Sequence, residues 1–149
     1  MGDSVRALIQ RVTKASVSVD QKTVGTIGAG LCVFVAVTHS DDEAAAQKLA
    51  SKIWNLRIFE DKEQRMNRSV GEVTGEILVV SQFTLYGDTS KGRRPSFVQA
   101  AAPEIAEPLI EKFCESLLAL GASIATGQFR AHMKVEIHND GPVTVSVDA

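Results

Sequence analysis

Short runs of apolar and β-branched residues dominate the start of the chain and predict strands. Three such runs occupy residues 5–12, 15–19 and 24–27. Separated by short polar and glycine-containing segments, they are typical of an antiparallel opening. Residues 31–37 are almost wholly apolar, and this continuity indicates a strand covered on both faces. We therefore expect residues 31–37 to lie at the centre of a sheet.

Two later segments carry apolar residues at three- and four-residue spacing, which predicts helices with one face on the sheet. The first follows Ser40-Asp41-Asp42-Glu43, whose spacing suits a capping box with Ser40 as the N-cap, and it continues to about Leu56. The second extends from Pro103 to Leu120 and ends at Gly121. The expected apolar faces are Ala45, Leu49, Ile53 and Leu56 in the first helix, and Ile105, Leu109, Phe113 and Leu117 in the second.

The remaining pattern predicts more strands. Residues 76–85 indicate another buried strand, and residues 87–95 a polar loop rich in turn residues. Apolar residues alternate over 133–137 and again over 143–147, and the Asn139–Pro142 segment between them predicts a closing hairpin or tight strand pair. No repeat or linker interrupts the pattern, so we expect one domain over residues 1–149.

The composition limits the class of protein. The 149 residues carry a formal net charge of −2, so any contact with nucleic acid must come from a local basic patch. Cys32 and Cys114 lie in apolar and amphipathic stretches that suit buried thiols and a reducing compartment. No membrane span or signal peptide is indicated, which favours the cytoplasm. Residues 1–4 precede the first patterned segment and are interpreted as a natural extension or a cloning remnant.

Common hydrolase motifs are absent from the sequence. It contains no G-x-S-x-G elbow, no H-E-x-x-H helix and no cysteine pair at metal spacing. His39, His132 and His138 are each interpreted as solvated loop or strand-end residues, and none is assigned a role. We therefore expect neither a metal site nor a cofactor.

Polar and aromatic groups cluster where the apolar strand Ile77–Val80 runs into Ser81-Gln82-Phe83-Thr84. Sites are often built at strand ends, although a strand that simply surfaces gives the same pattern. Gly141-Pro142 is equally ambiguous, because most X-Pro bonds are trans and Gly-Pro after Asn-Asp is usually a plain turn.

Together these segments resemble the D-aminoacyl-tRNA deacylase family from about Val5 to the C-terminus. The matching stretches are Arg6–Val12, Asn55–Phe59, Ser81–Leu85, Lys91–Phe97 and Asn139–Thr144. The resemblance implies an ester hydrolase that frees tRNA from a D-amino acid, a proofreading step of translation. It also implies a homodimer and a mixed α/β fold, with mostly antiparallel strands curled toward a barrel and two principal helices outside.

The resemblance implies that the Gly141–Pro142 bond is cis and enters the pocket of the partner subunit. The two carbonyls would accept hydrogen bonds from the substrate's α-ammonium group, so that an L side chain is driven into this backbone while a D side chain points away. Arg11 would brace the peptide, although it could also be an ordinary strand-surface arginine. Phe129 and Met133 match pocket-lining positions, whereas taken alone both would be core residues.

The resemblance also implies that Ser81–Thr84 forms the other wall of the pocket. The backbone N–H groups of Phe83 and Thr84 would then form an oxyanion hole for the ester carbonyl. The ribose 2′-hydroxyl of the tRNA and a water would assist. An older alternative makes Thr84 the nucleophile, but no His, Lys or α-amine lies near it in sequence to activate its hydroxyl.

The loop residues Lys91, Arg93 and Arg94 are the expected contacts to tRNA phosphates, with a solvated basic loop as the alternative. Glycine has no side chain to exclude, so glycyl-tRNA should also be cleaved.

Two other functions are open to a chain of this kind. One is a non-catalytic nucleic-acid-binding protein, since relatives have been linked to DNA at replication origins. The other is a related deacylase that removes L-alanine and has a trans Gly-Pro bond. Ser81-Gln82-Phe83-Thr84 favours the D-specific enzyme.

Overall fold

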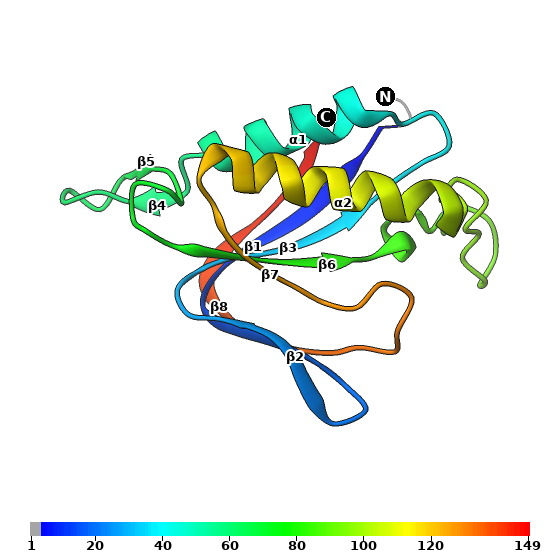
Figure 1. Ribbon diagram of the computed structural model, residues 1–149, viewed down its shortest axis with the longest axis horizontal. Coiled ribbons are helices and arrows are strands. Elements are labelled where there is room, and N and C mark those ends of the chain that lie inside the picture. The colour runs from blue at the N-terminus through cyan, green and yellow to red at the C-terminus, as the bar shows by residue number, and fades with distance from the viewer. Residues whose placement is uncertain (1–3) are drawn as a thin grey trace.

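The computed structural model describes residues 4–149, in which two helices cover one side of a curled sheet (Figure 1). The main sheet contains β1 (Arg6–Val19), β2 (Lys22–Ile27), β3 (Gly30–Ala36), β6 (Glu76–Ser81), β7 (Ser123–Thr126) and β8 (Lys134–Asp148). The other elements are α1 (Glu43–Asn55), β4 (Phe59–Glu60), β5 (Met66–Arg68), the 3-10 helix η1 (Phe83–Tyr86) and α2 (Pro103–Leu120). The expectation for the extreme N-terminus concerns residues 1–4, of which Met1–Asp3 lie outside the described residues.

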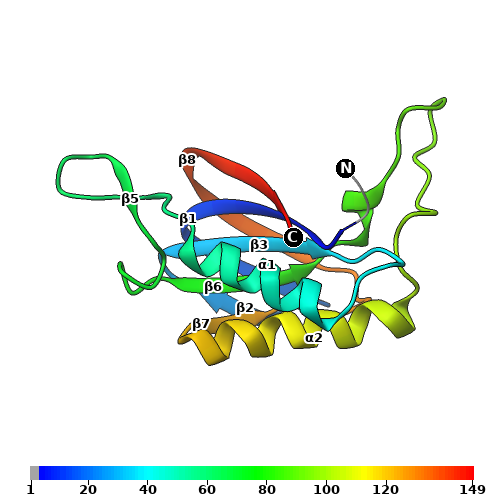
Figure 2. The same cartoon turned by 90° about the horizontal axis from the view of Figure 1, so that it is seen from above.

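The sheet has the order β2-β1-β3-β6-β7. The remaining strand, β8, lies off this path and also pairs with β1. β1 is antiparallel to β2, β3 and β8, whereas β3–β6 and β6–β7 are parallel. The two crossovers to the parallel strands contain α1 and α2, which places both helices on the same side of the sheet (Figure 2).

The two ends of this strand order come close together. A Cβ added to Gly25 of β2 would lie 2.5 Å from the carbonyl oxygen of Thr126 in β7, so only glycine permits this approach. The sheet is thus nearly closed into a barrel. The expected mixed α/β fold, with mostly antiparallel curled strands and two outer helices, is confirmed.

The central strand β3 is buried on both faces, as its continuous apolar sequence predicts. Leu31, Val33 and Val35 pack in the core cluster beneath the helices. Cys32 points into the interior of the curl, where it packs in a second cluster with residues such as Leu78 and Val80. Each face of the strand therefore supports a different core.

The helices agree with prediction in extent but not in every detail. α2 has the predicted limits, and Gly121 ends it in the left-handed conformation with φ 109°. In α1 the N-cap is Asp42, whose side chain accepts from the N–H of Ala45, so the prediction of Ser40 as N-cap is wrong. Residues 38–41 form a turn instead, because Asp41 N–H donates to the Thr38 carbonyl.

The predicted apolar faces are also partly wrong. Leu49, Ile53, Phe113 and Leu117 are buried as expected, but Ile105 is 44% exposed because Ala106 faces the core. Ala45, Leu56 and Leu109 are only partly buried and pack at the edge of the core.

Three strand boundaries differ from expectation. The runs 5–12 and 15–19 belong to one strand, β1. β6 ends at Ser81, and the chain then turns into η1. The expected closing hairpin at Asn139–Pro142 is wrong: β8 stays paired with β1 on both sides of this segment, which forms a bulge with register shifts opposite Gln10–Lys14.

Candidate functional site

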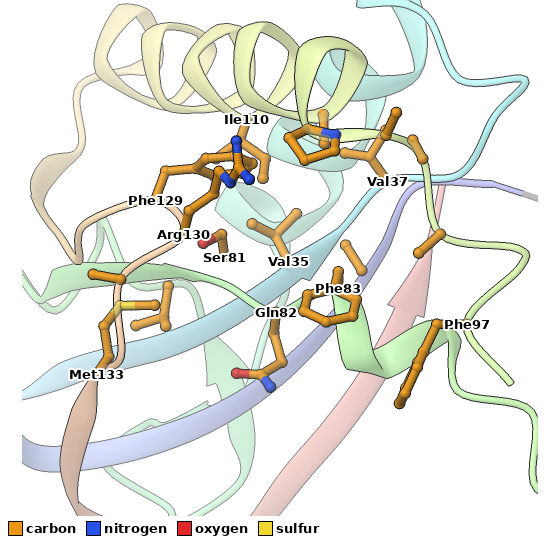
Figure 3. Close-up of a pocket in the computed structure, with 18 of the residues that line it drawn as sticks. Val35, Val37, Ser81, Gln82, Phe83, Phe97, Ile110, Phe129, Arg130 and Met133 are labelled. Carbon is orange, nitrogen blue, oxygen red and sulfur yellow. The ribbon is translucent and has the colours of Figure 1, made fainter. Parts of the chain in front are cut away.

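A cavity of about 700 Å³ opens where β3 and β6 end beneath the first half of α2 (Figure 3). Its volume lies in the range of small-molecule sites. The walls come from β3, β6, η1, the segment before α2, α2 itself and the segment before β8. The residues on these walls include Val35, Val37, Ser81, Gln82, Phe83, Phe97, Ala106, Ile110, Phe129, Arg130, His132 and Met133.

The turn at the end of β6 gives the cavity its polar wall. Ser81 pairs with Val35, and the N–H of Gln82 donates to the Val35 carbonyl at 2.8 Å, which fixes where the strand stops. Phe83 and Thr84 then open η1, and the first N–H groups of a helix have no acceptor within it. Neither group donates to a backbone or side-chain acceptor in the part of the chain that the structure describes. Two backbone donors are therefore free beside the cavity.

The structure brings most of the predicted turn and pocket residues together. Ser81, Gln82 and Phe83 line the cavity, as do Phe129 and Met133. Thr84 is exposed and is not part of the lining, and its hydroxyl accepts a hydrogen bond from Gln82 Nε2 at 2.5 Å. Its role stays a prediction, as do the roles of the other five residues.

Gly141 and Pro142 lie level with the start of β3, whereas the cavity lies at its end. The bulge that carries them faces Arg11, which pairs with Leu31, whereas Ser81 pairs with Val35 four residues further along β3. Both residues are exposed, and the bond between them is cis, as the family resemblance implies. They do not line the cavity of their own chain.

Arg11 is buried against this bulge and is not a strand-surface residue, since its exposed fraction is 6%. Its Nη1 donates to the Ile58 carbonyl at 2.8 Å. Its Nε lies 3.1 Å from Asp140 Oδ2, a contact with the distance but not the alignment of a hydrogen bond. Asn139 Nδ2 donates to the carbonyls of Arg11 and Val143 at 3.0 and 3.1 Å. These contacts tie both ends of the bulge to β1.

The predicted tRNA-binding residues Lys91, Arg93 and Arg94 lie in an exposed loop between η1 and α2. The loop projects beyond the sheet at the η1 end (Figure 2). An antiparallel bridge between Asp88 and Ser96 closes its base. None of the three cations has an ion pair within the described residues. The loop therefore presents unpaired positive charge beyond the η1 end of the sheet (Figure 2).

The histidines lie in three different settings. His39 Nε2 lies 2.6 Å from the Val98 carbonyl and fastens the segment before α2 to the end of β3. His138 lies in β8 opposite Lys14. His132 lines the cavity, a position that its charged sequence surroundings did not indicate. Within residues 4–149 no cluster of three potential metal ligands occurs, and no helix there could span a membrane.

The two thiols are poor nucleophiles. Burial raises the pKa of Cys32 to about 12. It also raises the pKa of Cys114 to about 11, helped by the charges of Glu111 and Glu115. Both are free and stay protonated near neutral pH, so neither supplies the reactive thiolate that cysteine chemistry needs.

Tyr86 is the last residue of η1, and its ring lies beneath the guanidinium of Arg6. Its side chain is 2% exposed, and the Arg6 guanidinium carbon lies 4.7 Å from the ring centroid. Burial raises the pKa of Tyr86 to about 12, with Asp41 adding to the effect and Arg6 opposing it. The phenol is therefore neutral near pH 7 and anchors the turn without acting as a base.

Comparison with known proteins identifies the family. The family model described as D-Tyr-tRNA(Tyr) deacylase matches residues 8–148. A D-aminoacyl-tRNA deacylase of Heliobacterium modesticaldum is 58% identical over 144 residues, covering 97% of this chain and 96% of the relative. One of Symbiobacterium thermophilum is 54% identical over 145 residues, with the same shares covered. The solved structure of a c-Myc DNA unwinding element binding protein superposes with a TM-score of 0.92 at 39% identity, covering 97% of this chain and 98% of that one. The chain therefore belongs to the D-Tyr-tRNA(Tyr) deacylase family.

Proposed function

We propose that this protein hydrolyses the ester bond of D-aminoacyl-tRNA, releasing tRNA and the D-amino acid. The observation that carries the proposal is the Ser81–Thr84 turn, with two unpaired backbone N–H groups beside a cavity, in a chain that matches deacylases over nearly its whole length. Such donors stabilise the oxyanion that forms when an ester carbonyl is attacked, and one is typically worth about 2.7–4 kcal/mol of barrier.

The attacking group in this mechanism is a water assisted by the ribose 2′-hydroxyl of the tRNA. In this proposal Thr84 is not the nucleophile. Support comes from the partner of its hydroxyl, the amide nitrogen of Gln82, which cannot accept a proton. A threonine hydroxyl without an adjacent base is a weak nucleophile near neutral pH. Ser81 and Gln82 shape the turn that holds the two backbone donors.

Handedness is selected by a second subunit in this proposal. Gly141 and Pro142 of one subunit enter the cavity of the other, and their carbonyls accept hydrogen bonds from the substrate's α-ammonium group. The proposal is supported by the exposure of both residues and by their distance along the sheet from their own cavity. Arg11 braces the bulge from beneath. An L side chain would collide with this backbone, and a D side chain would not.

Apolar surface beside the cavity supports the homodimer. Phe83 is 58% exposed, and its ring meets that of Phe97 edge to face with centroids 5.4 Å apart. Val98, which follows Phe97, is 76% exposed. Exposed apolar groups that gather at one place commonly mark an interface.

Two further parts of the proposal concern substrate range and place. Glycyl-tRNA is also cleaved, since glycine has no side chain to exclude; this part fails if glycyl-tRNA survives an enzyme concentration that clears D-tyrosyl-tRNA. The loop with Lys91, Arg93 and Arg94 holds tRNA phosphates without reading bases, so several tRNAs are accepted. The protein works as one domain in the cytoplasm.

A nucleic-acid-binding role is the second candidate, favoured by the name of the solved protein at 39% identity, a DNA unwinding element binding protein. A protein that only binds needs neither a cavity nor unpaired backbone donors beside it. The proposed hydrolysis accounts for both features.

The test is hydrolysis of matched D-tyrosyl-tRNA and L-tyrosyl-tRNA by the purified protein, with L-alanyl-tRNA as a third substrate. We expect rapid release from the D ester and little from either L ester. Cleavage of neither tyrosyl ester would leave the binding role. Preferential cleavage of L-alanyl-tRNA would assign the related L-alanine-removing activity.

A further inference from the structure

Arg130 lines the cavity in a backbone conformation that is uncommon for its residue type. Its φ is 67°, in the left-handed region that few residues other than glycine adopt. It lies in a tight turn in which the Ala131 N–H donates to the Gln128 carbonyl at 3.2 Å. Residues held in such conformations are concentrated at ligand sites. The turn directs this side chain to the cavity wall.

Arg130 is also the one permanently charged residue among those that line the cavity. The other polar groups there belong to Ser81, Gln82 and His132. No carboxylate within residues 4–149 lies within 4.0 Å of its guanidinium. Figure 3 shows the side chain beside Phe129, directed toward Ile110 on α2. A free guanidinium beside an apolar cavity suits an anionic ligand.

Three glutamates of α2 line a separate cavity. A second cavity of about 450 Å³ is lined by Glu107, Glu111 and Glu115 on α2. Ser81, Ile110 and Phe129 line both cavities and thus form the boundary between them. No carboxylate side chain is among the described residues that line the larger cavity, so the charge of Arg130 is available to a ligand there.

We infer that Arg130 binds the phosphate that joins the last two nucleotides of the tRNA 3′ end. This inference rests on the proposed function: with the ester carbonyl at the Ser81–Thr84 turn, the terminal nucleoside occupies the cavity and its phosphate follows at the rim. Arg130 is exposed to solvent and can reach that rim. The planar guanidinium pairs with two phosphate oxygens at once. Arg130 is thus a positioning residue that serves every tRNA, whatever amino acid it carries.

The test compares substrates with and without the phosphate. Arg130→Gly removes the cation and is compatible with the positive φ. Arg130→Lys keeps a positive charge but cannot pair with two phosphate oxygens at once as the planar guanidinium does. Lys48→Gln, on the exposed side of α1, is the control for the change in net charge. The substrates are D-tyrosyl-tRNA, D-aspartyl-tRNA and D-tyrosyl-adenosine, which lacks the phosphate. The readout is kcat/KM over a range of salt concentrations, with the thermal midpoint recorded for each variant.

Arg130→Gly is expected to lower kcat/KM about tenfold on both tRNA esters, as removal of one charge-assisted hydrogen-bonding partner predicts. The plot of log kcat/KM against log salt becomes less steep by about 0.7, the value for one neutralised phosphate on a single strand. Hydrolysis of D-tyrosyl-adenosine stays unchanged, Arg130→Lys falls in between, and Lys48→Gln matches the wild type.

Three results would overturn the inference. An equal loss on D-tyrosyl-adenosine would show that Arg130 only shapes the cavity. A loss confined to D-aspartyl-tRNA would assign the guanidinium to a side-chain carboxylate, and no loss at all would leave it without a ligand. Failure of the wild type to cleave D-tyrosyl-tRNA would instead count against the proposed function.

Discussion

The residue that sequence alone offers as a nucleophile, Thr84, lies beside the cavity with no base in contact. Its hydroxyl accepts from Gln82 Nε2, so substitution removes a hydrogen bond at the edge of the turn but no reacting group. We expect Thr84→Ala to lower kcat by less than about tenfold, equal to about 1.4 kcal/mol of barrier. Single-turnover hydrolysis of D-tyrosyl-tRNA measures this. Near-total loss in a variant with an unchanged thermal midpoint would make Thr84 the nucleophile.

The backbone donors can be tested directly at Phe83, the first residue of η1. Proline fits the first position of a helix and has no N–H, so Phe83→Pro removes one donor while keeping the turn. Phe83→Ala removes the ring but keeps the donor and serves as the matched control. We expect kcat of the proline variant to be about a hundredfold to a thousandfold below that of the alanine variant. Equal rates in the two variants would exclude this N–H from catalysis.

For single residues, the sequence predicts site residues that lie in a distinctive motif and misses those that do not. Ser81-Gln82-Phe83 stands out because polar groups follow an apolar strand, and all three residues line the cavity. Arg130 and His132 line the cavity too, but they lie in a charged stretch before a strand, and such a stretch does not indicate which side chains point into a cavity. The signal that could have found Arg130 is its positive φ, which only coordinates reveal.

Among the elements, α1 offers the clearest test of a corrected prediction. Ser40 and Asp42 both have N-cap chemistry, but the turn at residues 38–41 delays the helix until Glu43. We expect Asp42→Ala to lower the free energy of unfolding by about 1 kcal/mol, because the Ala45 N–H loses its acceptor. Ser40→Ala should change it far less. Urea unfolding measures the free energy of unfolding of both variants. A larger decrease in Ser40→Ala than in Asp42→Ala would support Ser40 as the N-cap.

The basic loop is tested by charge reversal at Arg93 and Arg94. Both cations are exposed and without ion pairs within the described chain, so substitution with Glu affects binding and not folding. We expect weaker tRNA affinity and a shallower dependence of log affinity on log salt, by about 0.7 to 0.9 for each phosphate that is no longer neutralised. Filter binding at several salt concentrations measures both. Unchanged affinity would assign tRNA binding to another surface.

Helices and strands were predictable where the apolar residues recur with strong periodicity. The connections between these elements were not predictable. The limits of α2 follow from its apolar spacing and from Gly121. The two runs of β1 are one strand because β8 pairs across the polar Thr13 and Lys14 through a bulge. The Asn139–Pro142 segment has the composition of a hairpin turn, yet it bulges out of β8, since pairing with β1 continues on both sides. Turn composition fixes local geometry and not the direction in which the chain continues.

In the whole molecule, the two parts of the proposed site lie level with opposite ends of the central strand β3. Strand order and register produce this separation, since Arg11 and Ser81 pair with residues of β3 that are four positions apart. No local sequence pattern encodes it. The close approach of β2 and β7 at Gly25 is equally a property of the assembled sheet. Because Gly141 and Pro142 do not line the cavity of their own chain, the proposed site needs these residues from a second subunit.

The most direct test of the account is therefore complementation between two damaged subunits. Gly141→Val places a branched side chain on the exposed bulge, away from its own cavity, while Phe83→Pro removes a backbone donor beside the cavity and leaves the bulge intact. Each homodimer should hydrolyse D-tyrosyl-tRNA slowly. Co-expressed with two different tags, the heterodimer should regain activity, because the intact cavity of one subunit receives the intact Gly141–Pro142 of the other. Purified heterodimers that stay as slow as the two homodimers, or full activity of Gly141→Val alone, would contradict a site shared between subunits.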